Sequence, residues 1–142
     1  MNKMDKSNFK KLIGIWKTEG TIFNDKGISE LIGTDTYEFI LENNYILHRA
    51  DVKMGNEKSE TYEIFELSDA TEKAKMQYFN SKGENGMMTS SIKEDNYRIK
   101  GDKIKFEGIF INKNTQLIGK WYLQTSTNEW IKFIDIKLTK QN

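Results

Sequence analysis

His48 is the only histidine of the chain, and it is the first candidate for a residue that binds a ligand or transfers a proton. It lies in the segment from Tyr45 to Val52, where the neighbours two or four positions away, Ile46, Ala50 and Val52, are apolar. Such residues share one face of an extended strand. We therefore expect His48 to point inward, where burial disfavours the charged imidazole. An inward imidazole could contact a ligand, bind a metal or act as a base. The alternative is a structural histidine satisfied by a tyrosine or a carbonyl.

Arg49 and Asp51 alternate with His48 and are expected on the outer, solvated face of the same strand. A slip of one residue in register would exchange the two faces. Arg49 would then point inward and anchor a carboxylate ligand through its paired N–H groups. A fatty acid or another carboxylate is the ligand that this alternative register predicts.

Methionine and aromatic side chains are candidates for the lining of the same interior. Methionine fills irregular apolar spaces, and tyrosine combines an apolar ring with a hydroxyl group. The predicted ligand-contacting residues are His48, Tyr62, Met76, Tyr78, Met88, Phe106 and Trp121. The alternative is that the methionines are ordinary core residues.

No constellation typical of catalysis or metal binding is evident. Ser90 and Ser91 lack the turn that exposes a catalytic serine. Glu60, Glu63 and Glu66 are expected on a solvated surface. The chain has no cysteine, and one histidine with scattered carboxylates shows no metal-ligand spacing. We therefore predict no catalytic residue, no metal and no cofactor, and we favour binding over catalysis.

Ten short β-like runs with turn residues between them position these side chains. They are expected at 12–23, 28–41, 45–54, 59–67, 73–80, 87–93, 97–100, 103–112, 116–125 and 129–139. Asparagine, aspartate and glycine fill the intervening turns. Many strands without a covering helix favour closure, which removes exposed edges. The predicted fold class is all-β, a closed antiparallel barrel of about ten strands around a cavity for one small ligand.

One short helical turn is expected near the N-terminus, at 5–11. Ser7 or Asp5 would cap it, and it would place Phe9, Leu12 and Ile13 as a plug. Trp16 is expected to be buried as the residue that closes the barrel. The whole chain, 1–142, is predicted to be a single domain, with 1–8 as a loosely ordered lead-in.

The segment Leu12 to Gly20, with Gly14 and Trp16, resembles the opening of lipocalin and calycin barrels, which include the fatty-acid-binding proteins. In those barrels the tryptophan closes one end. Runs at 62–65, 76–83 and 103–108 are similar to a family of small bacterial calycin-like domains of unknown function. The resemblance spans Phe9 to Leu138 and implies the barrel fold and a bacterial source, without a function.

The same opening also resembles that of the haem-binding nitrobindin group, a ten-stranded barrel. Gly14, Trp16 and Gly20 match its glycine and tryptophan positions, whereas Thr18 stands where that group has a glycine. The axial histidine of that group lies near the C-terminal strands. Here that region contains no histidine, so the resemblance does not extend to the haem site.

Charge and hydropathy exclude several partners. The chain has 22 Lys+Arg and 21 Asp+Glu, with a net charge of +1 and no long basic run, so we expect no nucleic-acid partner. No apolar run approaches a membrane span and no secretory signal is visible, so we expect a cytoplasmic protein without membrane insertion. The expected partner is a small apolar or amphipathic molecule, and a homodimer is left open.

Two other functions remain open at this point. One is a cavity enzyme, an isomerase or hydrolase with His48 as its base. The second is a protein-interaction module with a filled barrel. A carboxylate beside an inward His48 would favour the enzyme, whereas a core without a cavity would favour the interaction module.

Overall fold

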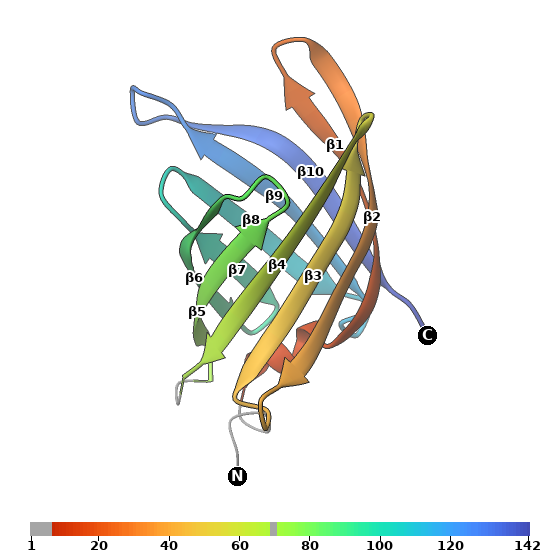
Figure 1. Ribbon diagram of the computed structural model, residues 1–142, viewed down its shortest axis with the longest axis vertical. Helices are drawn as coiled ribbons and strands as arrows, with labels where there is room; N and C mark the ends of the chain where they lie inside the picture. Colours follow the sequence, from red (N-terminus) through yellow and green to blue (C-terminus); the bar gives the residue numbers. More distant parts are fainter. Residues whose placement is uncertain (1–6, 69–70) are drawn as a thin grey trace.

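Ten antiparallel strands close into a barrel in the computed structural model, which describes residues 7–68 and 71–142 (Figure 1). The strands are β1 (Gly14–Asn24), β2 (Gly27–Ile40), β3 (Tyr45–Met54), β4 (Glu57–Leu67), β5 (Lys73–Asn80), β6 (Asn85–Lys93), β7 (Asn96–Lys100), β8 (Ile104–Ile111), β9 (Gln116–Gln124) and β10 (Trp130–Lys140). Each strand pairs with its neighbours in sequence, and β1 pairs with β10 to close the sheet. The predicted all-β closed barrel is confirmed.

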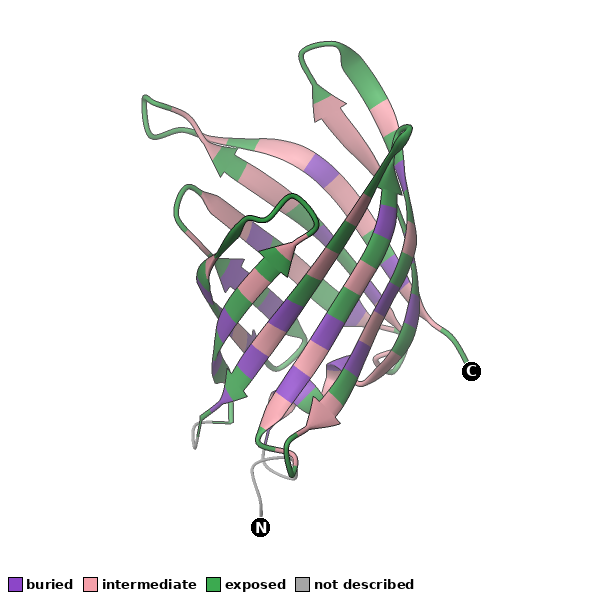
Figure 2. Cartoon of the chain, viewed as in Figure 1, coloured by how far each residue is buried: buried purple, intermediate pink, exposed green. Residues whose placement is uncertain are grey.

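Buried and exposed residues alternate along the strands, as Figure 2 shows. In β8, Phe106 and Phe110 are 3% and 2% exposed, whereas Glu107 between them is exposed. Alternate side chains of a strand point to opposite faces of the sheet. The period-2 pattern of the sequence therefore marks the inner and outer faces of the barrel.

A short 3-10 turn, η1 (Asn8–Leu12), lies at one end of the barrel, the lower end in Figure 1. The Ser7 side chain accepts a hydrogen bond from the backbone N–H of Phe9, so Ser7 is the cap; Asp5 lies outside the described residues. Asn8 bonds to the backbones of Thr71 and Ile92. These hydrogen bonds anchor Ser7 and Asn8 at the start of the turn.

Trp16 is fully buried above this turn, and its indole N–H donates to the carbonyl of Leu12 at 2.7 Å. Its predicted burial against the N-terminal turn is confirmed. Around it lies a dense cluster that we call the plug, which fills this end of the barrel. The plug consists of the buried residues of this cluster other than Met88, which lines the cavity described below: Phe9, Leu12, Trp16, Tyr37, Ile46, Phe65, Leu67, Ala74, Met76, Ile92, Tyr97, Ile99, Phe106, Phe110, Leu117 and Leu138.

Across residues 7–68 and 71–142, no helix has the length and apolar character needed to cross a membrane.

Candidate functional site

A cavity of about 500 Å³ occupies the part of the barrel that the plug leaves free. Its walls include Leu31, Val52, Met88, Ile104 and Trp121. It extends to the turns after β3, β5 and β7, where its lining includes Met54, Asn80 and Asp102. These turns lie at the end of the barrel opposite η1, so the plug forms a floor and the far turns form a mouth.

His48 lines this cavity at the boundary with the plug, and it is 8% exposed. Its ring stacks on that of Tyr37, with 4.0 Å between the ring centroids and 9° between the planes. Tyr37 stands directly across the sheet from His48 because the β2–β3 hairpin pairs these two positions. The predicted inward orientation of His48 is therefore present, with an aromatic ring of the floor beneath it.

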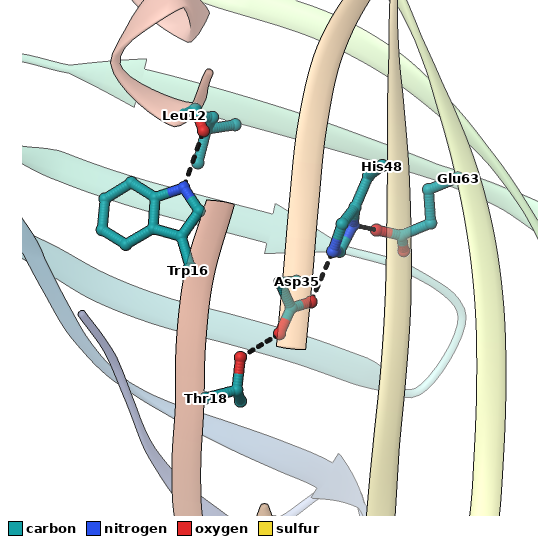
Figure 3. A network of polar contacts seen from close by, with 6 residues as sticks. All are labelled: Leu12, Trp16, Thr18, Asp35, His48 and Glu63. Atoms are coloured by element: carbon teal, nitrogen blue, oxygen red, sulfur yellow. Dashed lines mark hydrogen bonds and ion pairs between the residues drawn. The ribbon is translucent and has the colours of Figure 1, made fainter. Parts of the chain in front are cut away.

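Both ring nitrogens of His48 contact carboxylates (Figure 3). Nδ1 lies 2.5 Å from Oε1 of Glu63, and Nε2 lies 2.5 Å from Oδ1 of Asp35. Thr18 donates its hydroxyl hydrogen bond to Oδ2 of Asp35. Strands β1 to β4 contribute one residue each, so four neighbouring strands build one buried polar cluster of Thr18, Asp35, His48 and Glu63.

Glu63 keeps one carboxylate oxygen free. Its Oε1 contacts His48, while Oε2 has no hydrogen-bond partner among residues 7–68 and 71–142 (Figure 3). In that part of the chain every fully buried polar side-chain atom has a partner. Oε2 is therefore accessible, and because Glu63 lines the cavity, it can accept a hydrogen bond there.

Two opposing effects set the pKa of His48. Burial lowers it, whereas the charge of Glu63 and the hydrogen bonds to Asp35 and Glu63 outweigh burial and raise the pKa to about 9. His48 is thus an imidazolium at neutral pH. The expectation that burial would favour the neutral ring is wrong, because it took no account of the two carboxylates.

Two tyrosines beside the cluster keep their protons. Burial, with Tyr97, Asp35 and Glu63 nearby, raises the pKa of Tyr37 well above its ordinary value. Burial and the same two carboxylates do the same for the pKa of Tyr97. Both phenols therefore stay neutral and do not compete for the imidazolium. The anionic partners of His48 are the carboxylates of Asp35 and Glu63.

Six of the seven predicted ligand-contacting residues point inward, and they divide into two groups. His48, Tyr78, Met88 and Trp121 line the cavity. Met76 and Phe106 belong to the plug instead, with 0% and 3% exposure. The Phe106 ring lies over Gly119, where an added Cβ would come within 2.3 Å of it. These two inward residues pack into the core of the barrel rather than around the cavity.

Tyr62 lies on the outer face and is 47% exposed, so the structure does not place it in the cavity. It is on the opposite face of β4 from Glu63, its neighbour in sequence. Arg49 stacks over the Tyr62 ring, 5.7 Å from its centroid, and pairs with Glu38 at 3.2 Å. The alternative register, with Arg49 as an inward anchor for a carboxylate, is therefore wrong.

Asp35 and Glu63 are the functional candidates that sequence reasoning missed. Glu63 was expected on a solvated surface together with Glu60 and Glu66, but it is 8% exposed. Glutamates three residues apart alternate between the faces of a strand, so the three cannot share one surface. Asp35 shares its face with Leu31 and Tyr37, and a carboxylate in such a row is a sign of a buried polar site.

A second hollow, of about 430 Å³, lies along β1, β2, β9 and β10. Its charged lining residues include Glu19, Glu30, Lys120 and Lys137, all exposed. Exposed charges are solvated and provide little binding energy. The polar cluster lies in the larger cavity, and we place the candidate site there.

The described residues contain no group of three or more His, Asp and Glu side chains arranged to hold a metal ion. In the protonated ring both nitrogens carry a hydrogen and donate to carboxylate oxygens, so the charged His48 has no lone pair to offer a metal. Axial ligation of haem by His48 would require at least one of these contacts to break.

Comparison with solved structures identifies barrels of the same fold. Rv2717c from M. tuberculosis is 7% identical, with a TM-score of 0.75, over 100% of this chain and 99% of that one. The S-type phycobiliprotein lyase CPES from Guillardia theta is 11% identical, with a TM-score of 0.65, and the match covers 94% of this chain and 90% of that one. A de novo designed fluorescence-activating β-barrel is 12% identical, with a TM-score of 0.50, and the match covers 99% of this chain and 100% of that one.

These similarities show the fold alone. No protein-family model matches the sequence, and no curated protein matches it either.

Proposed function

We propose that this chain is a calycin-like barrel that binds a small amphipathic molecule in its cavity. The observation that carries the proposal is a cavity of about 500 Å³ with mostly apolar walls and one buried polar cluster at its floor. Ligand sites commonly combine apolar walls with a few placed polar groups. The apolar part of the ligand would lie against Met88, Val52 and Trp121, and its polar end would face His48 and Glu63.

The fold comparisons are consistent with this proposal. The neighbours include a phycobiliprotein lyase and a designed fluorescence-activating barrel. The plug supports the proposal as well, since it blocks one end of the barrel and leaves a single mouth. A fully filled barrel, which the interaction-module alternative requires, does not fit a cavity of this size. We further propose a cytoplasmic, bacterial protein.

Native mass spectrometry of the protein purified from its own source tests this function. We expect a bound small molecule at one copy per chain. The variant Ala50→Phe, in which the new ring enters the cavity beside His48, should lose that molecule. The matched variant Asp51→Phe, with its new ring on the exposed face of β3, should keep it. Retention by both variants would place the ligand outside the cavity.

A second candidate function is acid–base catalysis in the same cavity, by an isomerase or hydrolase. The observation that favours it is an imidazole between two carboxylates beside a cavity, since perturbed ionisable groups gather in active sites. The charged His48 is not suited to be the base. Glu63, with Oε2 accessible, would take the proton, and His48 would hold the carboxylate in place.

Comparison of the molecules retained by the wild type and by Glu63→Gln separates catalysis from binding. An enzyme would retain product in the wild type and unconverted substrate in the variant, and chromatography with mass spectrometry would distinguish them. The same molecule in both proteins would contradict catalysis by Glu63.

A further inference from the structure

We propose that the cavity selects amphipathic molecules with a cationic ammonium end, and that the Glu63 carboxylate binds this end. The inference rests on the proposed binding function and names the chemical class of its ligand. It follows from the charges of the lining and from the one carboxylate oxygen left free in the polar cluster.

The charged side chains that line the cavity are Asp35, His48, Glu63 and Asp102. None of the lining residues in the described part of the chain is lysine or arginine. Three carboxylates and one imidazolium therefore leave an excess of negative charge around the ligand. Arg49, the nearest cation in sequence to His48, is on the outer face with Glu38. A carboxylate ligand would find no free cation, because His48 already contacts two carboxylates.

The position of the free oxygen identifies Glu63 as the binding group. Both oxygens of Asp35 are engaged, one by His48 and the other by the Thr18 hydroxyl. Glu63 uses only Oε1, and its Oε2 is accessible in the cavity. The Glu63 side chain is 10% exposed, so a donor that reaches Oε2 does so in a largely dehydrated environment. Ionic hydrogen bonds are stronger there than in water.

The charge balance of the cluster favours a cation over a neutral donor. With both carboxylates ionised and His48 protonated, Asp35, His48 and Glu63 together carry one net negative charge. A buried charge without compensation is costly, and an opposite charge nearby offsets that cost. An ammonium group at Oε2 would make the site neutral and supply the N–H donor that this oxygen lacks. A long apolar chain would then extend toward Met88 and Trp121.

Three ligands with the same chain and different ends test the proposal: decylamine, decanol and decanoate. Calorimetric titration at neutral pH compares a cation, a neutral donor and an anion with equal apolar burial. We expect decylamine to bind at least about tenfold more tightly than decanol, and decanoate to bind most weakly. Equal affinities for the three, or tighter binding of decanoate, would overturn the charge selection and leave the binding function standing. Failure of all three to bind would overturn both.

Glu63→Gln tests the assigned residue. The amide keeps the shape of the side chain but removes its charge, so we expect the preference for decylamine over decanol to fall to about twofold or less. Glu60→Gln, on the exposed face of the same strand, should keep the wild-type preference. An unchanged preference in folded Glu63→Gln would overturn the assignment to Glu63.

A measurement on the wild type covers the case in which Glu63→Gln does not fold. His48 is the only histidine, so its imidazole gives a single set of NMR signals. Decylamine should shift these signals more than decanol does at saturation, because the ammonium would share Glu63 with His48. Equal shifts would place the ammonium away from Glu63 and overturn the proposal.

Discussion

His48 and Glu63 stand directly opposite each other on β3 and β4, with 2.5 Å between Nδ1 and Oε1. On its other side the imidazole contacts Asp35, so one ring links two carboxylates at the floor of the cavity. Burial disfavours the imidazolium, and the two carboxylates favour it more strongly. This balance makes the protonation state of His48 the most direct report on the cluster.

The imidazole of His48 should titrate with a pKa of about 9 in the folded protein. Since this histidine is alone in the chain, an NMR titration of its ring signals measures the value without assignment of other residues. Glu63→Gln should lower the pKa, because a neutral amide no longer favours the charged ring. A titration near pH 6.5, the ordinary value for histidine, would contradict the two-carboxylate geometry.

Stability should fall as the pH rises from about 6.5 to about 9.5, because the pKa of His48 is higher in the folded chain than in the unfolded one. The stabilisation is fully present below the unfolded pKa and disappears as the pH passes the folded pKa. The expected loss is about 3 kcal/mol of unfolding free energy. Urea unfolding at several pH values measures it, and His48→Gln should lack this component of the pH dependence.

Thr18→Val should destabilise the barrel by about 1–2 kcal/mol. The substitution removes the hydroxyl donor from a buried carboxylate oxygen of Asp35 and keeps the branched shape of the side chain. Thr34→Val provides the control, since Thr34 is exposed on the outer face of β2 and should change stability by less than about 0.5 kcal/mol. Equal costs for the two variants would show that the Thr18 hydroxyl does not support Asp35.

Trp16→Ala should cost roughly 3–5 kcal/mol, as expected for loss of a large core aromatic. Trp16 is fully buried in the plug, and its indole also bonds to Leu12. Trp130→Ala is the matched variant. It should cost less than Trp16→Ala, because Trp130 is only partly buried and its ring lies beneath the Lys105 ammonium. A cost below about 1 kcal/mol for Trp16→Ala would contradict its role as the residue that closes the barrel.

Much of the fold could be predicted from the sequence because strand and turn patterns are local. The strand predicted at 45–54 is followed by Gly55 and Asn56, which form a two-residue turn in the structure. Such turns fix the register of a hairpin. That turn pairs Met54 with Glu57, and the same number of steps along both strands brings His48 opposite Glu63. The contact between these two residues could therefore have been found from the sequence.

The rest of the site depends on contacts that span more than one hairpin. Asp35 lies diagonally from His48, since the residue directly opposite His48 on β2 is Tyr37. The height of the floor is also a property of the whole barrel. It depends on how far the side chains of η1 and β1 reach inward, so alternation alone could not separate Met76 and Phe106 in the plug from Met88 and Trp121 in the cavity.

Haem should not bind to the protein with one-to-one stoichiometry. Both nitrogens of His48 contact carboxylates, and ligation of iron would break an ionic hydrogen bond in a buried cluster. A titration with haem monitored in the Soret region should show no saturable band. A stoichiometric band that disappears in His48→Ala would contradict this expectation and identify His48 as an axial ligand.

Binding of a neutral, polarity-sensitive dye such as Nile red tests the central claim most directly, because it needs the cavity and not the charge preference. We expect one saturable site per chain in the wild type and in Asp51→Phe. Ala50→Phe, with its new ring inside the cavity, should bind at least about tenfold more weakly. Equal binding by Ala50→Phe and Asp51→Phe, or no saturable binding by the wild type, would contradict a ligand site above His48.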